Sequence, residues 1–161
     1  MPAPIIFYFD FSSPYGYLAS TQIDALAAKH GRDVDWRPFL LGAVFKISGM
    51  KPLLDVPIKG DYTKRDFARS ARFFGVPFVM PANFPFAAVA ASRAIYWLKD
   101  RDQDTAKRLA KIVYHAAFGV GRDITAAETV AELAAPLGID RTALLSAVND
   151  PAVKDRLKAE V

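Results

Sequence analysis

The chain of 161 residues contains no cysteine. A protein without cysteine cannot form disulfides, carry a Cys-Cys redox pair, build a zinc–thiolate site or use a cysteine nucleophile. Any thiol chemistry must therefore use a thiol that a ligand brings in. Histidine is scarce as well, since only His30 and His115 are present, and this disfavours a metal site built from imidazoles.

Several other signatures are missing. The sequence has no Gly-x-Ser-x-Gly elbow of a serine hydrolase. No apolar run reaches the length of about 18 residues that a membrane-spanning helix needs. The first four residues, Met-Pro-Ala-Pro, lack the charged and apolar regions of a signal peptide. We therefore expect a cytoplasmic protein that does not enter a membrane.

The charge is mildly positive, with a formal net charge of +4 at pH 7. The basic residues are scattered among acidic ones, and no basic block is interleaved with aromatic residues, so we expect no nucleic-acid partner. A mild positive balance suits small anionic ligands at least as well. An apolar share of 52% and this length predict one compact folded domain.

The first forty residues predict a strand, a helix and a second strand. Residues 5–10 and 34–39 are short runs rich in β-branched and aromatic residues, which is typical of buried strands. Between them, Ser13-Pro14 is a helix-start signal, and apolar residues recur at helical spacing up to Gly31. Such a βαβ unit implies parallel strands with a right-handed crossover.

The rest of the chain predicts helices around one long loop. Residues 48–60 carry two glycines besides Pro52 and Pro57, and a loop of this length inside a compact domain is usually functional. A capping box, Thr125 to Glu128, and an N-cap at Asp150 mark two of the helix starts. Helices are predicted over 40–47, 61–74, 86–99, 103–118, 125–137, 140–148 and 151–160, with an extended segment over 75–85.

The junction between the first strand and the first helix carries the strongest chemical signal. Ser13 stands where backbone N–H groups are unpaired and the helix dipole is positive, so an anion is stabilised there. A thiol with a pKa near about 8.5 ionises more easily at such a point, and a serine hydroxyl can donate a hydrogen bond to its sulfur. The competing interpretation is that Ser13 is only an N-cap.

The same junction resembles a known family. Residues 8–18, YFDFSSPYGYL, are similar to the N-terminal motif of kappa-class glutathione transferases and bacterial 2-hydroxychromene-2-carboxylate isomerases, which are relatives of the DsbA-type oxidoreductases. In that family the serine before the proline stands in place of the redox cysteine and contacts the glutathione sulfur, and here it is Ser13. The likeness continues through RPFLLG at 37–42, PIKGDY at 57–62, PANFP at 81–85 and RDIT at 122–125.

The resemblance implies an α/β thioredoxin-like fold, with a βαβ opening and an inserted all-helical domain. Residues 1–40 are then the N-terminal part of the thioredoxin-like domain, 41–150 a mostly helical insertion with a ligand-lining loop over 40–60, and 151–161 the start of the return to that domain. Family members continue with a C-terminal β-hairpin and a last helix. We expect these to be missing from this chain, either because it is part of a longer protein or because it is a remnant.

The resemblance also implies site residues, with Ser13 as the catalytic one. It places glutathione against Ser13, Pro14, Tyr15, Lys59 and Met50, and the substrate against Lys46, Met50, Lys51, Asn83 and Phe84. Met50 stands where the family usually has asparagine, and it cannot donate an amide hydrogen bond. For the lysines, the competing interpretation is that they are solvated loop residues.

The function that the resemblance implies is glutathione-dependent isomerisation of 2-hydroxychromene-2-carboxylate to trans-o-hydroxybenzylidenepyruvate in aromatic-compound degradation. Glutathione would act as a cofactor and would not be consumed. Two alternatives remain open at this point: a kappa-type glutathione transferase that conjugates electrophiles, and a non-enzymatic thioredoxin-like binding module. Family members often form homodimers, and the sequence alone does not decide this.

Overall fold

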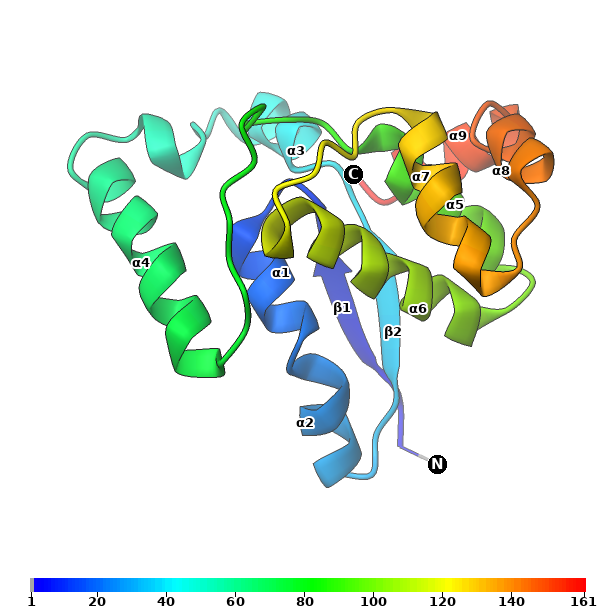
Figure 1. Ribbon diagram of the computed structural model, residues 1–161, viewed down its shortest axis with the longest axis horizontal. Coiled ribbons are helices and arrows are strands. Elements are labelled where there is room, and N and C mark those ends of the chain that lie inside the picture. Colours follow the sequence, from blue (N-terminus) through cyan, green and yellow to red (C-terminus); the bar gives the residue numbers. More distant parts are fainter. Residues whose placement is uncertain (1) are drawn as a thin grey trace.

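The computed structural model describes residues 2–161, and its sheet pairs two parallel strands, β1 (Ile5–Phe9) and β2 (Val34–Pro38) (Figure 1). Ile5 lies opposite Val34, and Phe9 lies opposite Pro38. Two helices, α1 (Pro14–Ser20) and α2 (Ile23–Lys29), connect the strands. The βαβ opening is therefore confirmed.

The predicted single helix between the strands is interrupted after α1. The hydroxyl of Ser20 donates to the carbonyl of Tyr17 at 2.6 Å, and the hydroxyl of Thr21 donates to the carbonyl of Leu18 at 2.7 Å. Serine and threonine side chains that bond back to carbonyls in this way compete with the helical backbone pattern. Local side-chain chemistry therefore explains why α2 starts afresh at Ile23.

One face of the sheet is buried and the other is partly open. Phe9 and Trp36 are buried and pack edge-on at 5.4 Å between ring centroids. Phe9 also meets Tyr114 of α6 (Gln103–Tyr114) at 5.6 Å, and Figure 1 shows α6 crossing in front of both strands. Ile6 and Tyr8 point to the opposite face and are half exposed. The aromatic core therefore lies between the sheet and the helices on the α6 side.

Helices make up most of the remaining chain. Predicted helix 103–118 is α6 continued by a π-helical turn, and predicted helix 86–99 starts only at Val89. The remaining elements are α3 (Leu41–Ser48), the 3₁₀ turn η1 (Leu53–Asp55), α4 (Lys59–Phe74), α5 (Val89–Lys99), the π-helical turn η2 (His115–Gly119), α7 (Ala127–Ala134), the 3₁₀ turn η3 (Ala135–Leu137), α8 (Arg141–Ala147) and α9 (Pro151–Lys158). Within residues 2–161, no helix has both the length and the apolar character needed to cross a bilayer.

Of the two helix starts predicted from caps after residue 120, one is confirmed and one is wrong. The Asp150 carboxylate accepts a hydrogen bond from the N–H of Ala152 at 2.7 Å, as an N-cap should. The capping box at Thr125 does not form, because α7 begins two residues later, after Ala126. The Asp123 carboxylate instead accepts both the N–H and the hydroxyl of Thr125, which is an Asx-type turn.

Candidate active site

Ser13 is the N-cap of α1. Its Oγ accepts a hydrogen bond from the N–H of Gly16 at 3.1 Å, and Pro14 fills the first helical position, where no N–H is needed. The N–H of Ser13 donates to the carbonyl of Asp10 at 2.8 Å, which closes the turn between strand and helix. A hydroxyl that accepts one hydrogen bond still has its own hydrogen to donate. Ser13 can therefore cap the helix and donate to a ligand at the same time.

Asp10 ties this turn to the next helix. Its side chain is buried, and its two oxygens accept from the N–H groups of Ser12 at 2.7 Å and Leu41 at 2.6 Å. Leu41 begins α3, whose N-cap residue Leu40 offers no side-chain acceptor, so the Asp10 carboxylate takes over that role. Burial raises the pKa of the Asp10 carboxyl, and the two N–H groups oppose that rise.

A cleft of about 570 Å³ opens beside Ser13. Its walls are mostly apolar, and among the residues that line it Lys46 is the one cation, with Asp10 and Asp55 as the carboxylates. The lining comes from the turn at the end of β1, from α3, from η1, from Phe67 of α4 and from the segment Phe84–Val89. A concave, largely apolar site with a few polar groups is the usual form of a small-molecule site.

The structure brings together part of the predicted site. Five of the predicted residues line the cleft: Ser13, Pro14, Tyr15, Lys46 and Phe84. The other four, Met50, Lys51, Lys59 and Asn83, are not among its lining residues. Met50 has 65% of its surface exposed. Roles in binding or catalysis for all nine remain predictions.

Some lining residues carry no sequence signal of their own. Phe67 lies on the buried face of the amphipathic helix α4, so its spacing indicates core packing. It also lines the cleft. Leu53, Leu54 and Asp55 belong to the loop that was expected to line the ligand site, but nothing in the pattern singles them out. Phe45 lies one residue before Lys46 on α3, within the family likeness, but its apolar character alone does not distinguish a ligand contact from core packing.

Tyr15 links the cleft to α4. Its hydroxyl donates to Asp66 at 2.7 Å, and its ring packs against Phe67 at 4.7 Å between centroids. Burial, reinforced by Asp66, raises the pKa of Tyr15 to about 12. The hydroxyl therefore stays protonated and hydrogen-bonded to Asp66 at neutral pH.

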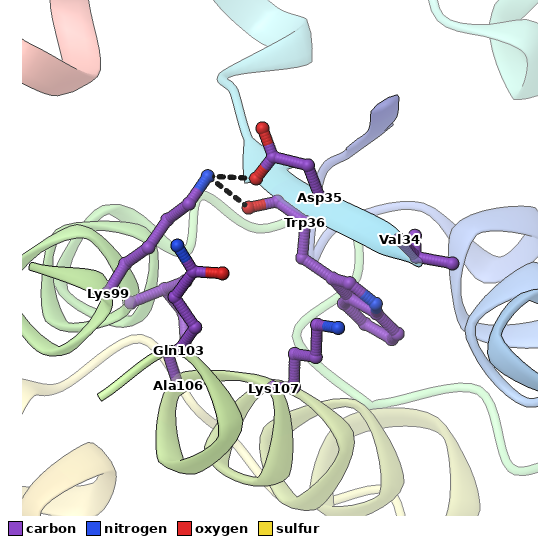
Figure 2. Close-up of a pocket in the computed structure, with 8 residues that line it drawn as sticks. Val34, Asp35, Trp36, Lys99, Gln103, Ala106 and Lys107 are labelled. Carbon is purple, nitrogen blue, oxygen red and sulfur yellow. Dashed lines mark hydrogen bonds and ion pairs between the residues drawn. The ribbon is translucent and has the colours of Figure 1, made fainter. Parts of the chain in front are cut away.

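A second hollow lies between β2 and the helices α5 and α6 (Figure 2). Lys99 spans it and binds the carboxylate of Asp35 and the carbonyl of Trp36, the latter at 3.2 Å. The hollow has a volume of about 10 Å³, which is about the space that one buried water needs. Because the ammonium group is already paired and the space is so small, this hollow offers no ligand site.

An isomerase and a glutathione transferase are similar to this chain in sequence. The chain is 30% identical to a 2-hydroxychromene-2-carboxylate isomerase of Pseudomonas putida over 152 residues, which covers 93% of this chain and 73% of that protein. It is 31% identical to glutathione S-transferase kappa 1 of Caenorhabditis elegans over 113 residues, which covers 66% of this chain and 50% of that protein.

A solved structure agrees with these sequence relatives. The crystallised 2-hydroxychromene-2-carboxylate isomerase superposes with a TM-score of 0.82 at 29% identity, over 96% of this chain and 75% of that one. The family of DSBA-like thioredoxin domains matches residues 4–161. The chain therefore belongs to the DSBA-like thioredoxin domain family, within which its relatives are isomerases and glutathione transferases.

Proposed function

We propose that this protein is a glutathione-dependent isomerase of 2-hydroxychromene-2-carboxylate or a closely similar aromatic carboxylate. One observation carries the proposal: Ser13, Lys46 and Phe84 line the same cleft. They offer a hydroxyl donor for a sulfur, a cation for a carboxylate and an aromatic wall for a ring. The relatives named as isomerases of this substrate support the assignment.

The size of the cleft and the chemical types of its lining residues suit glutathione. Its volume of about 570 Å³ is within the usual range for small-molecule sites. Ser13 supplies a donor at the opening turn of α1, and Lys46 and Asp55 offer charges of both signs, which suits a ligand with carboxylates and an ammonium group. When bound, glutathione would supply a thiolate that adds reversibly to a conjugated double bond and so allows rotation about it.

The residues of the chain would perform the remaining tasks. Ser13 would donate a hydrogen bond to the sulfur and thereby favour its ionised form. Lys46 would hold the substrate carboxylate by a charge-assisted hydrogen bond and so orient the ring. Phe84 and Phe86, which stack edge-on at 6.1 Å in the cleft wall, would exclude water from the reacting double bond.

Replacing Ser13 tests the proposal. Ser13→Ala should lower kcat/KM for isomerisation about 100-fold, at the lower end of what removal of a donor to a developing charge costs. Ser13→Gly is the matched variant, because glycine is nearly as good an N-cap and lacks the hydroxyl. Ser13→Gly should therefore keep most of the thermal stability and still lose the activity. If both variants turn over as fast as the wild type with glutathione present, Ser13 has no catalytic role.

A kappa-type transferase is the second candidate, because transferases of that name are among the relatives. The two reactions differ in what happens to the thiol. Conjugation consumes free glutathione in proportion to turnover, whereas isomerisation leaves its concentration unchanged. A thiol titration during turnover of a chromene carboxylate and of an electrophilic aryl halide decides between them. If a calorimetric titration detects no binding of glutathione, both enzyme candidates fail. The non-enzymatic thioredoxin-like binding module is then the candidate that remains.

Two further expectations belong to this proposal. We also propose a homodimer, as family members often form, and a cytoplasmic location, and both remain predictions. Sedimentation equilibrium over a range of concentrations tests the first, and fractionation of cells that express the full protein tests the second.

A further inference from the structure

A fully buried tyrosine lies directly beneath the proposed catalytic serine. Tyr114 is the last residue of α6, and its hydroxyl donates to the carbonyl of Asp10 at 2.8 Å. The same carbonyl accepts the N–H of Ser13, also at 2.8 Å. One oxygen atom therefore connects the tyrosine on α6 to the backbone of the serine turn.

The ring of Tyr114 has little freedom to move. It packs against Phe11 at 4.9 Å, Phe9 at 5.6 Å and Tyr17 at 6.1 Å between centroids. Side chains in interiors packed in this way sit in rotamer minima and interdigitate with few voids. Burial, with a smaller contribution from the charge of Asp10, raises the pKa of Tyr114 well above its ordinary value, so its hydroxyl remains a donor.

Gly16 has no side chain and so leaves room for the Tyr114 hydroxyl. Gly16 lies in the first turn of α1, and a Cβ there would clash with the Tyr114 hydroxyl and come within 3.2 Å of the Ser13 Cβ. The N–H of Gly16 also donates to the Oγ of Ser13. The hydroxyl of Tyr114 therefore fits between the Asp10 carbonyl on one side and the backbone of Gly16 on the other, and it touches both ends of the serine turn.

We propose that Tyr114 is a positioning residue that holds the Ser13 hydroxyl at its place in the cleft. This inference rests on the proposed function, because it concerns where the donor to the sulfur sits. Tyr114 is not among the residues that line the cleft, so it acts through the Asp10 carbonyl and Gly16. A displacement of a catalytic group by about 1 Å can lower a rate by about a hundredfold, so a support of this kind matters for turnover.

Tyr114→Phe removes one hydroxyl and keeps the ring. The matched control is Tyr96→Phe, because Tyr96 is equally buried and its hydroxyl also donates to a backbone carbonyl, that of Pro38, at 2.7 Å. Both variants should lose similar thermal stability. Only Tyr114→Phe should lower kcat/KM, by about tenfold or more, and raise the pKa of the bound glutathione thiol, read from thiolate absorbance against pH.

A second experiment uses the close contact at Gly16. Gly16→Ala should strongly reduce activity in the wild type, because the new methyl meets the Tyr114 hydroxyl. In the Tyr114→Phe background that hydroxyl is gone, and the same change should reduce activity less. The two changes should therefore lower melting temperature and log kcat/KM by less than the sum of their separate effects, a pattern that two independent structural losses do not produce.

The outcomes separate this inference from the proposed function. If the wild type neither binds glutathione nor turns over, the proposed function fails before Tyr114 is tested. If the wild type is active and Tyr114→Phe matches Tyr96→Phe in kcat/KM and thiol pKa, the positioning role is overturned. An equal penalty for Gly16→Ala in both backgrounds would overturn it as well.

Discussion

At the scale of single residues, the cleft contains one cation. Lys46 lies on α3, and no other lysine or arginine lines the cleft within residues 2–161. Lys46→Ala should raise KM for the carboxylate substrate about fivefold and change kcat little, because a charge-assisted contact at an exposed site contributes about 1 kcal/mol. Steady-state kinetics over a range of substrate concentrations measure both constants.

The control for Lys46 is a lysine of similar exposure away from the cleft. Lys64 lies on α4, 3.6 Å from the carboxylate of Asp61, and lines no part of the cleft. Lys64→Ala lowers the net charge by the same amount and should leave KM unchanged. Equal rises in KM for the two variants would mean that Lys46 acts only through the overall charge of the protein.

At the scale of elements, the Tyr15–Asp66 hydrogen bond fastens α1 to α4. The pKa of Tyr15 is raised from 10.0 in an unfolded chain to about 12. Because the folded state holds this proton more tightly, the stability from Tyr15 is fully present below pH 10 and is lost as the pH rises towards 12. The wild type should therefore exceed Tyr15→Phe in stability at neutral pH, and the gap should close in that alkaline window.

Urea unfolding at a series of pH values measures this difference. Other groups that titrate in the alkaline range are common to both proteins and cancel in the comparison. Asp66→Asn is a useful companion, because it removes the acceptor charge and leaves the tyrosine in place. A stability gap between wild type and Tyr15→Phe that stays constant up to pH 12 would contradict the shifted pKa of Tyr15.

At the scale of the whole molecule, a ligand that binds only the folded protein must stabilise it. Glutathione at about a hundred times its Kd should raise the melting temperature by about 5 to 10 °C for a chain of this size. The sulfur-free analogue, in which a methyl group replaces the thiol, should raise it less, because the Ser13 donor has no thiolate to meet. Differential scanning calorimetry with both ligands makes the comparison.

The same measurement on Ser13→Gly should show no difference between the two ligands. That variant should respond to glutathione and to the sulfur-free analogue alike. Equal stabilisation of the wild type by the two ligands would show that the sulfur contributes no measurable binding free energy. The site would then recognise only the peptide portion of glutathione.

Much of the local structure was predictable, because it depends on short-range physics. The strand at the N-terminus follows from its run of β-branched and aromatic residues, and the helix start follows from Ser13-Pro14. The break between α1 and α2 was missed, since hydroxyls that bond back to carbonyls leave no mark on apolar spacing. The failed capping box has a similar cause: Asp123 competes for the same threonine from two residues upstream.

The sequence by itself determined the absence of an intrinsic thiol and the placing of a hydroxyl at a helix start, and the family motif extended these to glutathione. Tertiary structure alone decided that Lys46 lines the cleft while Lys51 and Lys59 do not, and that Asp10 and Tyr114 meet at one turn. The reason is distance along the chain: Tyr114 and Asp10 are 104 positions apart, and no local pattern records a contact that only packing creates.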